Sequence, residues 1–194
     1  ATSITNGDGQ TAAAGSNHNA FAARIAVSPL GAMANDEPDL AISKKPQFTI
    51  GANYLHNTVD AAGYTGYETL AGDLGEVNNF GVDAHFKWLG ASLQGEAIFF
   101  DADRANGTDR RALGWYAQAG YMVTPKIGLA LRYSQYDPNR DASNDLQSEQ
   151  IGAVSYYFDK HNLKLQADVA NIHKQTSSGP TDDLQFRVQA QLVF

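Results

Sequence analysis

The stretch LQFRVQAQLVF, residues 184–194, decides the fold. Its apolar side chains occupy every second position from Leu184 onward, and the intervening positions carry mainly glutamine and arginine. Successive side chains of a β-strand point to opposite faces, so the pattern predicts a strand with one apolar face and one polar face. Which face is wet depends on whether the rest of the chain repeats the pattern.

The same alternation recurs along most of the chain. It is clear in FGVDAHFKW (80–88), IGLALRYSQY (127–136) and NLKLQADVAN (162–171). Period-two segments of this length predict β-strands. We predict strands at 18–29, 46–57, 79–89, 91–101, 112–123, 126–136, 147–158, 161–173 and 184–194, and we read ATSIT at residues 1–5 as the end of a tenth.

Short and long connections alternate between these strands. Short ones fall at 89–91, 124–126 and 159–162, and long polar ones at 57–78, 102–111, 137–145 and 174–183. Tight turns at one end and long loops at the other are typical of an outer-membrane β-barrel. Residues 30–45 break this rule, because they form a long connection on the predicted turn side.

A soluble β-sandwich also alternates apolar and polar residues, with its apolar face turned inward. Here the apolar parity is rich in alanine, and aromatic residues gather near both strand ends, as in the two aromatic girdles of a membrane barrel. We assign Trp88, Tyr121, Tyr157 and Phe158 to the turn-end girdle, and Tyr54, Phe99, Phe100, Trp115, Tyr133, Tyr136 and Phe186 to the loop-end girdle. The pattern therefore favours an all-β, antiparallel transmembrane β-barrel domain spanning residues 1–194.

Composition narrows the function classes. The chain has no cysteine, which excludes disulfides and thiolate metal sites, and its net charge of −7 argues against nucleic-acid binding. No apolar run approaches the roughly 20 residues of a membrane-spanning helix. The first residues lack the features of a signal peptide, so we expect that one was removed or that the chain begins partway through a longer protein.

The C-terminal half resembles a known family. The segments WYAQAGYMVTPKIGLALRYSQYDPN, NDLQSEQIGAVSYYFDKHNLKLQADVANI and DDLQFRVQAQLVF, with ITNGDGQ and AARIAVSPLG upstream, are similar to the phosphate-selective porin O and P family. The resemblance implies a barrel of about 16 strands, wide enough for an aqueous channel. Nine or ten strands cannot make all of it, so this chain would form its C-terminal part; the alternative is a naturally small barrel. It also implies passive diffusion of anions, phosphate among them, and assembly as a homotrimer.

Residues of the polar parity are the candidates for lining a pore. The cations are Arg24, Lys87, Arg132, Lys164 and Arg187, and the acidic and amide residues are Asp83, Glu96, Gln118, Asp168 and Gln189. Arginine binds phosphate through a planar fork and lysine as a point charge, so these types suit an anion path. The alternative is that paired charges simply line a wet lumen.

Other chemistry has weaker support. No nucleophile, metalloprotease or phosphate-loop motif is present, so we predict no enzymatic activity and no cofactor. The loop DPNRDASND offers Asp137, Asn139, Asp141 and Asp145 as a calcium candidate, although it lacks a turn glycine.

The sequence thus predicts an outer-membrane porin for small hydrophilic solutes, with anions such as phosphate as the candidate cargo. Its expected partners are the lipid bilayer and lipopolysaccharide, and no nucleic acid. The alternative from another class is a structural barrel that docks or sheathes another component of the envelope.

Overall fold

The computed structural model describes residues 1–194 except 7–18, 35, 59–73, 105–108 and 194. The terminal Phe194 and part of the ITNGDGQ segment therefore lie outside the described residues. No helix in the described ranges is long and apolar enough to cross a membrane. The strands are β1 (Thr2–Asn6), β2 (Asn19–Val27), β3 (Gln47–Thr58), β4 (Leu74–Trp88), β5 (Ala91–Arg104), β6 (Arg110–Thr124), β7 (Ile127–Asp137), β8 (Gln147–Asp159), β9 (Leu163–Lys174) and β10 (Thr181–Leu192).

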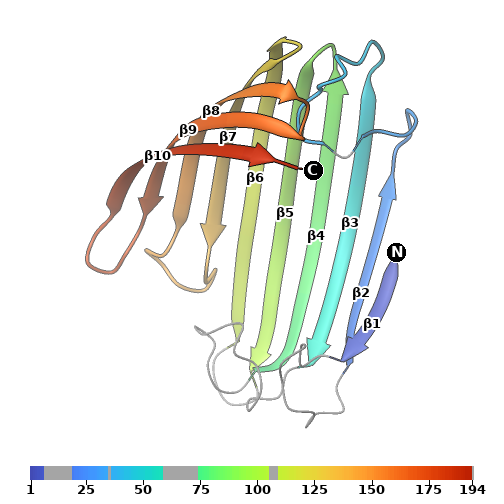
Figure 1. Ribbon diagram of the computed structural model, residues 1–194. Helices are drawn as coiled ribbons and strands as arrows, with labels where there is room; N and C mark the ends of the chain where they lie inside the picture. Colours follow the sequence, from blue (N-terminus) through green and yellow to red (C-terminus); the bar gives the residue numbers. More distant parts are fainter. Residues whose placement is uncertain (7–18, 35, 59–73, 105–108, 194) are drawn as a thin grey trace.

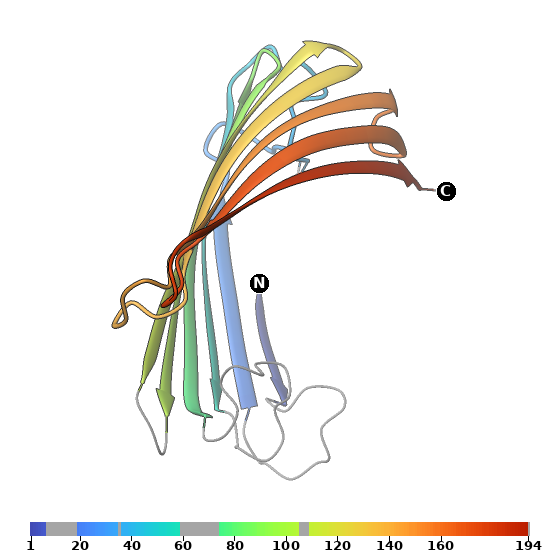
Figure 2. The same cartoon turned by 90° about the vertical axis from the view of Figure 1, so that its left-hand side faces the viewer.

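All these strands form one ten-stranded antiparallel sheet in which spatial order follows sequence order from β1 to β10 (Figure 1). The predicted all-β meander is confirmed, including the tenth strand at the start of the chain. Within the described residues β1 and β10 are the two edges of the sheet and do not pair with each other. The sheet curls, most strongly where β8–β10 approach their turn end (Figure 2).

Tight turns join the strands at one end of the sheet. The β4–β5 turn consists of Leu89 and Gly90, whose φ angles of 51° and 84° are both left-handed. That conformation is required at both centres of the two-residue hairpin turn whose twist matches the flanking strands, and glycine adopts it without steric cost. At the β6–β7 turn the Thr124 hydroxyl accepts hydrogen bonds from the backbone amides of Lys126 and Ile127.

Two strands are longer than the alternation predicts. We expected a connection over residues 57–78 and another from Ala102, but β4 begins at Leu74 and β5 continues to Arg104. Here Val77 pairs with Ala102 and Asn78 with Asp101, although GEVNN does not alternate. The backbone ladder continues where apolar and polar residues no longer alternate in the sequence, so side-chain periodicity misses it.

The strand register sorts the side chains into two faces. One face is apolar and bare, and it carries residues such as Leu129, Val188 and Phe186, the last with 78% of its surface exposed. The other face carries the charged and amide side chains, which we call the polar face. The polar face lies on the inside of the curl. Asp36, which lies between β2 and β3, contacts both Lys87 of β4 and His161 of the β8–β9 turn across this face.

Three aromatic assignments were wrong. Phe100, Tyr136 and Tyr157 have the same parity as Glu96, Arg132 and Ser155 on their own strands, and so belong to the polar face. Tyr157 is only 7% exposed, and its ring packs over Gly128, where an added Cβ would lie 3.3 Å from Cε2 of the ring. These rings had been placed by their nearness to strand ends, whereas the face of a strand residue is fixed by its parity. Trp88, Tyr121 and Phe158 are exposed on the apolar face.

Residues 28–46, which we call the β2–β3 connection, join β2 to β3 at the turn end of the sheet, with residue 35 outside the description. The connection is held to the wall at several points. Ser28 Oγ lies 2.8 Å from Thr49 Oγ1, and the Leu89 amide donates to the Ser43 carbonyl at 2.9 Å. The β2–β3 connection, which breaks the pattern of short turns at this end of the sheet, is therefore an ordered part of the fold.

Candidate functional site

The predicted pore-lining residues share the polar face. Register pairs Arg24 with Asn53, Asp83 with Glu96, and Lys164 with Gln191 across neighbouring strands. All the predicted positions follow this parity: Arg24, Asp83, Lys87, Glu96, Gln118, Arg132, Lys164, Asp168, Arg187 and Gln189. The structure therefore brings the whole set to one surface, while its role in conduction stays a prediction.

Arg24 is neutralised within the wall. Its guanidinium donates to both carboxylate oxygens of Asp83, at 2.7 and 2.9 Å, in a bidentate pair that crosses β3. Gly51 lies beneath this pair, and a Cβ at that position would come within 2.6 Å of Arg24 Nη2. Glycine is thus needed here for a close approach of side chains and not for an unusual backbone angle.

Arg187 is also neutralised. Its Nε donates to Asp168 Oδ1 at 2.7 Å, and its Nη1 lies 3.7 Å from Glu149 Oε1. Glu149 was not among the predicted lining residues. Its parity on β8 places it on the polar face, where it pairs with Ile172 near the loop end of the sheet. Arginine held between two carboxylates offers little unbalanced charge to a solute.

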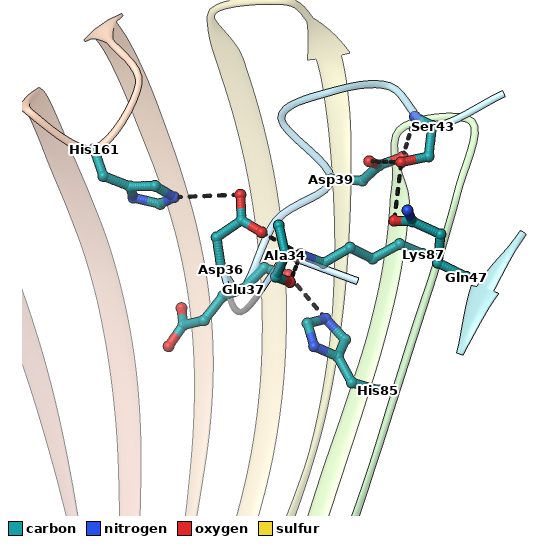
Figure 3. Close-up of polar contacts among 9 residues, drawn as sticks. All are labelled: Ala34, Asp36, Glu37, Asp39, Ser43, Gln47, His85, Lys87 and His161. Carbon is teal, nitrogen blue, oxygen red and sulfur yellow. Dashed lines mark hydrogen bonds and ion pairs between the residues drawn. The ribbon is translucent and has the colours of Figure 1, made fainter. Parts of the chain in front are cut away.

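Lys87 has become an anchor rather than a solute-facing cation. Its side chain is only 2% exposed, and Nζ donates to the Ala34 carbonyl at 2.9 Å and to the carboxylate of Asp36 (Figure 3). Partial burial raises the pKa of Asp36, but the hydrogen bond and positive charge of Lys87 outweigh it and hold that pKa below its usual range. The β2–β3 connection is therefore tied to β4 by an ion pair in which the lysine is buried and the carboxylate is partly exposed.

The same connection reaches the far side of the curl. Asp36 Oδ2 lies 3.8 Å from His161 Nε2, which belongs to the β8–β9 turn. His85 Nε2 lies 3.2 Å from the Glu37 carbonyl oxygen and donates to it when protonated at that nitrogen. Figure 3 shows this stretch between β4 and the His161 turn, with the Glu37 carboxylate directed away from Lys87.

Asp39 fixes the base of the connection. It is 2% exposed, and its carboxylate accepts hydrogen bonds from the backbone amides of Ser43 and Gly90 and from the Ser43 hydroxyl, at 2.7–2.8 Å. A carboxylate with this many donors is stable in a buried position. Asp36, Glu37 and Asp39 were not among the residues predicted from the sequence. The signal that could have marked them is the acidic run NDEPD on an unusually long connection at the turn side.

Arg132 and Lys164 differ from the other wall cations, because no ion pair is recorded for either in the part of the chain that the structure describes. The guanidinium of Arg132 lies over the Tyr116 ring, 4.0 Å from its centroid, and its Nε is buried with no hydrogen-bond partner. Stacking on a ring positions the guanidinium but leaves its charge uncompensated.

These two cations share one cavity of about 230 Å³. It lies between the polar face of β6–β10 and the β2–β3 connection, and its lining includes Glu37, Pro38, Arg132, Lys164, Asp168 and Arg187. The cavity thus has two uncompensated cations on the wall and one carboxylate from the connection.

The calcium candidate is not gathered into a site. Asp141 pairs with Arg111 at 2.7 Å, while Asp137 and Asn139 accept hydrogen bonds from backbone amides two residues ahead. No hydrogen bond or ion pair joins Asp145 to the other three residues in the described part of the chain. In the same ranges, no group of at least three histidine, cysteine or acidic residues could hold a metal ion. Calcium binding by this loop stays a prediction.

Comparison with known proteins gives one family. The family model described as "Phosphate-selective porin O and P" matches residues 2–194. No curated protein and no solved structure gives a significant match. The match covers essentially all of the sheet described above.

Proposed function

Because the chain belongs to the phosphate-selective porin O and P family, we propose that it is a passive channel for small hydrophilic solutes with a preference for anions such as phosphate. Proteins of this family are porins of the outer membrane, so the protein lies there and acts as a channel rather than as an enzyme. The apolar face of the sheet then faces lipid and the polar face faces water.

The observation that supports anion preference is the uncompensated charge of Arg132 and Lys164 on one cavity wall. Arg24, Lys87 and Arg187 each have a carboxylate partner at hydrogen-bonding distance. A passing anion therefore gains most from the two cations that lack such a partner.

The two side chains offer complementary contacts to a phosphate group. Arginine donates to a phosphate through the planar fork of its guanidinium. Lysine supplies a compact point charge that adapts to a moving ligand. Low-dielectric walls around a narrow passage concentrate counter-ions near such charges, so a small number of them affects selectivity.

The test is the reversal potential of the purified full-length protein in a planar bilayer under a potassium chloride gradient. We expect chloride preference in the wild type, and a shift toward potassium in the double variant Arg132→Gln, Lys164→Gln. Arg140→Gln is the matched control, because Arg140 is an exposed cation on the loop side. A wild-type channel that prefers potassium would contradict the anion path.

The scaffold alternative makes a different prediction in the same experiment. A barrel that sheathes another envelope component gives no conductance steps, whereas a porin does. We further propose contacts with lipopolysaccharide and assembly as a homotrimer, both implied by the family resemblance. Chemical cross-linking in native outer membranes, followed by mass analysis of the unheated protein, tests the trimer.

A further inference from the structure

We infer that the β2–β3 connection is a selectivity element within the lumen, and that Glu37 is the residue through which it limits the anion preference of the channel. The inference rests on the proposed porin function and assigns a specificity role to a segment on the turn side of the barrel. It is carried by the position of the connection, by the neutralisation of Lys87 and by the unpaired carboxylate of Glu37.

The connection lies across the inside of the curl rather than at its rim. Lys87 on β4 holds the Ala34 carbonyl and the Asp36 carboxylate, and Asp36 also approaches His161 of the β8–β9 turn. Several intervening strands separate these two attachment points (Figure 1). A segment that contacts both sides of a curved sheet occupies part of the space between them, so solutes pass beside it.

The connection also changes the charge of that space. Lys87 would be a free cation on the bare wall, but Asp36 cancels it, and the connection then adds the carboxylate of Glu37. Glu37 is exposed, and in the described part of the chain neither an ion pair nor a side-chain hydrogen bond is recorded for its carboxylate. The docked connection therefore makes the turn side of the lumen more negative.

Glu37 faces the same cavity as Arg132 and Lys164, from the opposite side. An anion attracted by the two wall cations meets a like charge across the passage, while a small cation is attracted to Glu37. A carboxylate across a narrow passage partly cancels the potential of the wall cations and so lowers the local concentration of anions. Glu37 thus sets how far the wall cations can favour anions.

The experiment measures reversal potentials for Glu37→Gln and Glu37→Lys in the full-length protein under a potassium chloride gradient. We expect Glu37→Gln to lower the ratio of potassium to chloride permeability about tenfold, because removing one unit charge at roughly 6 Å in water changes the local concentrations of potassium and chloride about threefold each, in opposite directions. Glu37→Lys should lower it further. Because the Glu37 side chain is exposed and unpaired, both variants should fold, which the shift in gel mobility on heating verifies.

Asp145→Asn is the matched control, since it removes one acidic charge from the loop side and should leave the ratio near that of the wild type. An unchanged ratio in both Glu37 variants, with normal conductance, overturns the inference even if Arg132→Gln, Lys164→Gln shifts selectivity as proposed. If the Glu37 variants shift the ratio and the double variant does not, the inference stands and the anion path fails. A silent wild-type barrel contradicts both.

Discussion

Lys87 shows how a residue can occupy its predicted face and still have another role. Parity places it correctly on the polar face, where a lysine is expected to attract passing anions. The structure instead buries its side chain to 2% exposure against the β2–β3 connection. A parity argument gives the direction of a side chain, but not what lies in front of it.

Removing this anchor should loosen the connection. We expect Lys87→Met to cost about 1–3 kcal/mol of stability, because the Ala34 carbonyl and the Asp36 carboxylate lose their buried donor. It should also raise single-channel conductance and expose residues 28–46 to protease. Lys45→Met is the control, since Lys45 is an exposed lysine on the same connection. Unchanged conductance and protease resistance in Lys87→Met would show that other contacts suffice.

The Lys87–Asp36 ion pair should weaken when the pH is lowered. Lys87 holds the pKa of Asp36 below its ordinary value of 3.8, so the ion pair stabilises the docked connection above that pH. This stabilisation is lost as the pH falls through the lowered pKa. Protease susceptibility of residues 28–46 should therefore stay constant from neutral pH to about pH 4.5, and rise only below the ordinary carboxyl range.

Asp36→Asn is the control for this titration, because it should be susceptible at every pH and lose the acid-dependent rise. A rise that instead began near pH 6 would identify a histidine rather than Asp36 as the controlling group, with His85 on β4 the nearest candidate.

At the scale of the element, the strands follow directly from their alternation. In β7 the side chains of Leu129 and Leu131 are exposed on the apolar face, while Arg132 has the opposite parity and stacks on Tyr116 of β6. Each strand of this kind has one face that tolerates charge and one that does not.

A pair of substitutions in β7 tests this assignment of faces. Leu129→Arg should impair membrane insertion and cost about 2–4 kcal/mol if the residue lies near the bilayer midplane. Arg132→Leu should insert and fold nearly as well as the wild type. The measurement is the folded fraction after dilution from urea into lipid vesicles. Equal insertion of the two variants would mean that the faces are wrongly assigned.

The strand boundaries and the connections were less predictable than the strand cores. The start of β4 was missed because GEVNN has no alternation, although the ladder to β5 continues through it. The β2–β3 connection was recognised only as an exception in length. Its position depends on contacts with His85, Lys87 and Gly90, which no local sequence pattern encodes.

At the scale of the whole molecule, the net charge of −7 is a poor guide to the passage. On the polar face, Arg24 is balanced by Asp83 and Arg187 by Asp168 and Glu149, so much of the wall charge cancels. In the proposed channel, selectivity would then depend on the small number of charges that remain unpaired. The sequence could supply the residue types of the candidate site, but pairing depends on neighbours in space and became visible only in the structure.

The anchoring of the β2–β3 connection has a consequence for the order of folding. Its hydrogen bonds to Lys87 and Gly90 join residues that are 51 to 53 positions apart in the sequence. Lys87 and Gly90 are therefore synthesised after the connection itself. Closing such long loops costs entropy that only the completed contacts offset, which makes them slow to form. We therefore expect the β4–β5 and β8–β9 hairpins to pair before the connection docks between them. Docking would then be a late step in assembly, and a barrel that had finished its strand ladder but not this step would have a wider and less acidic interior than the mature protein.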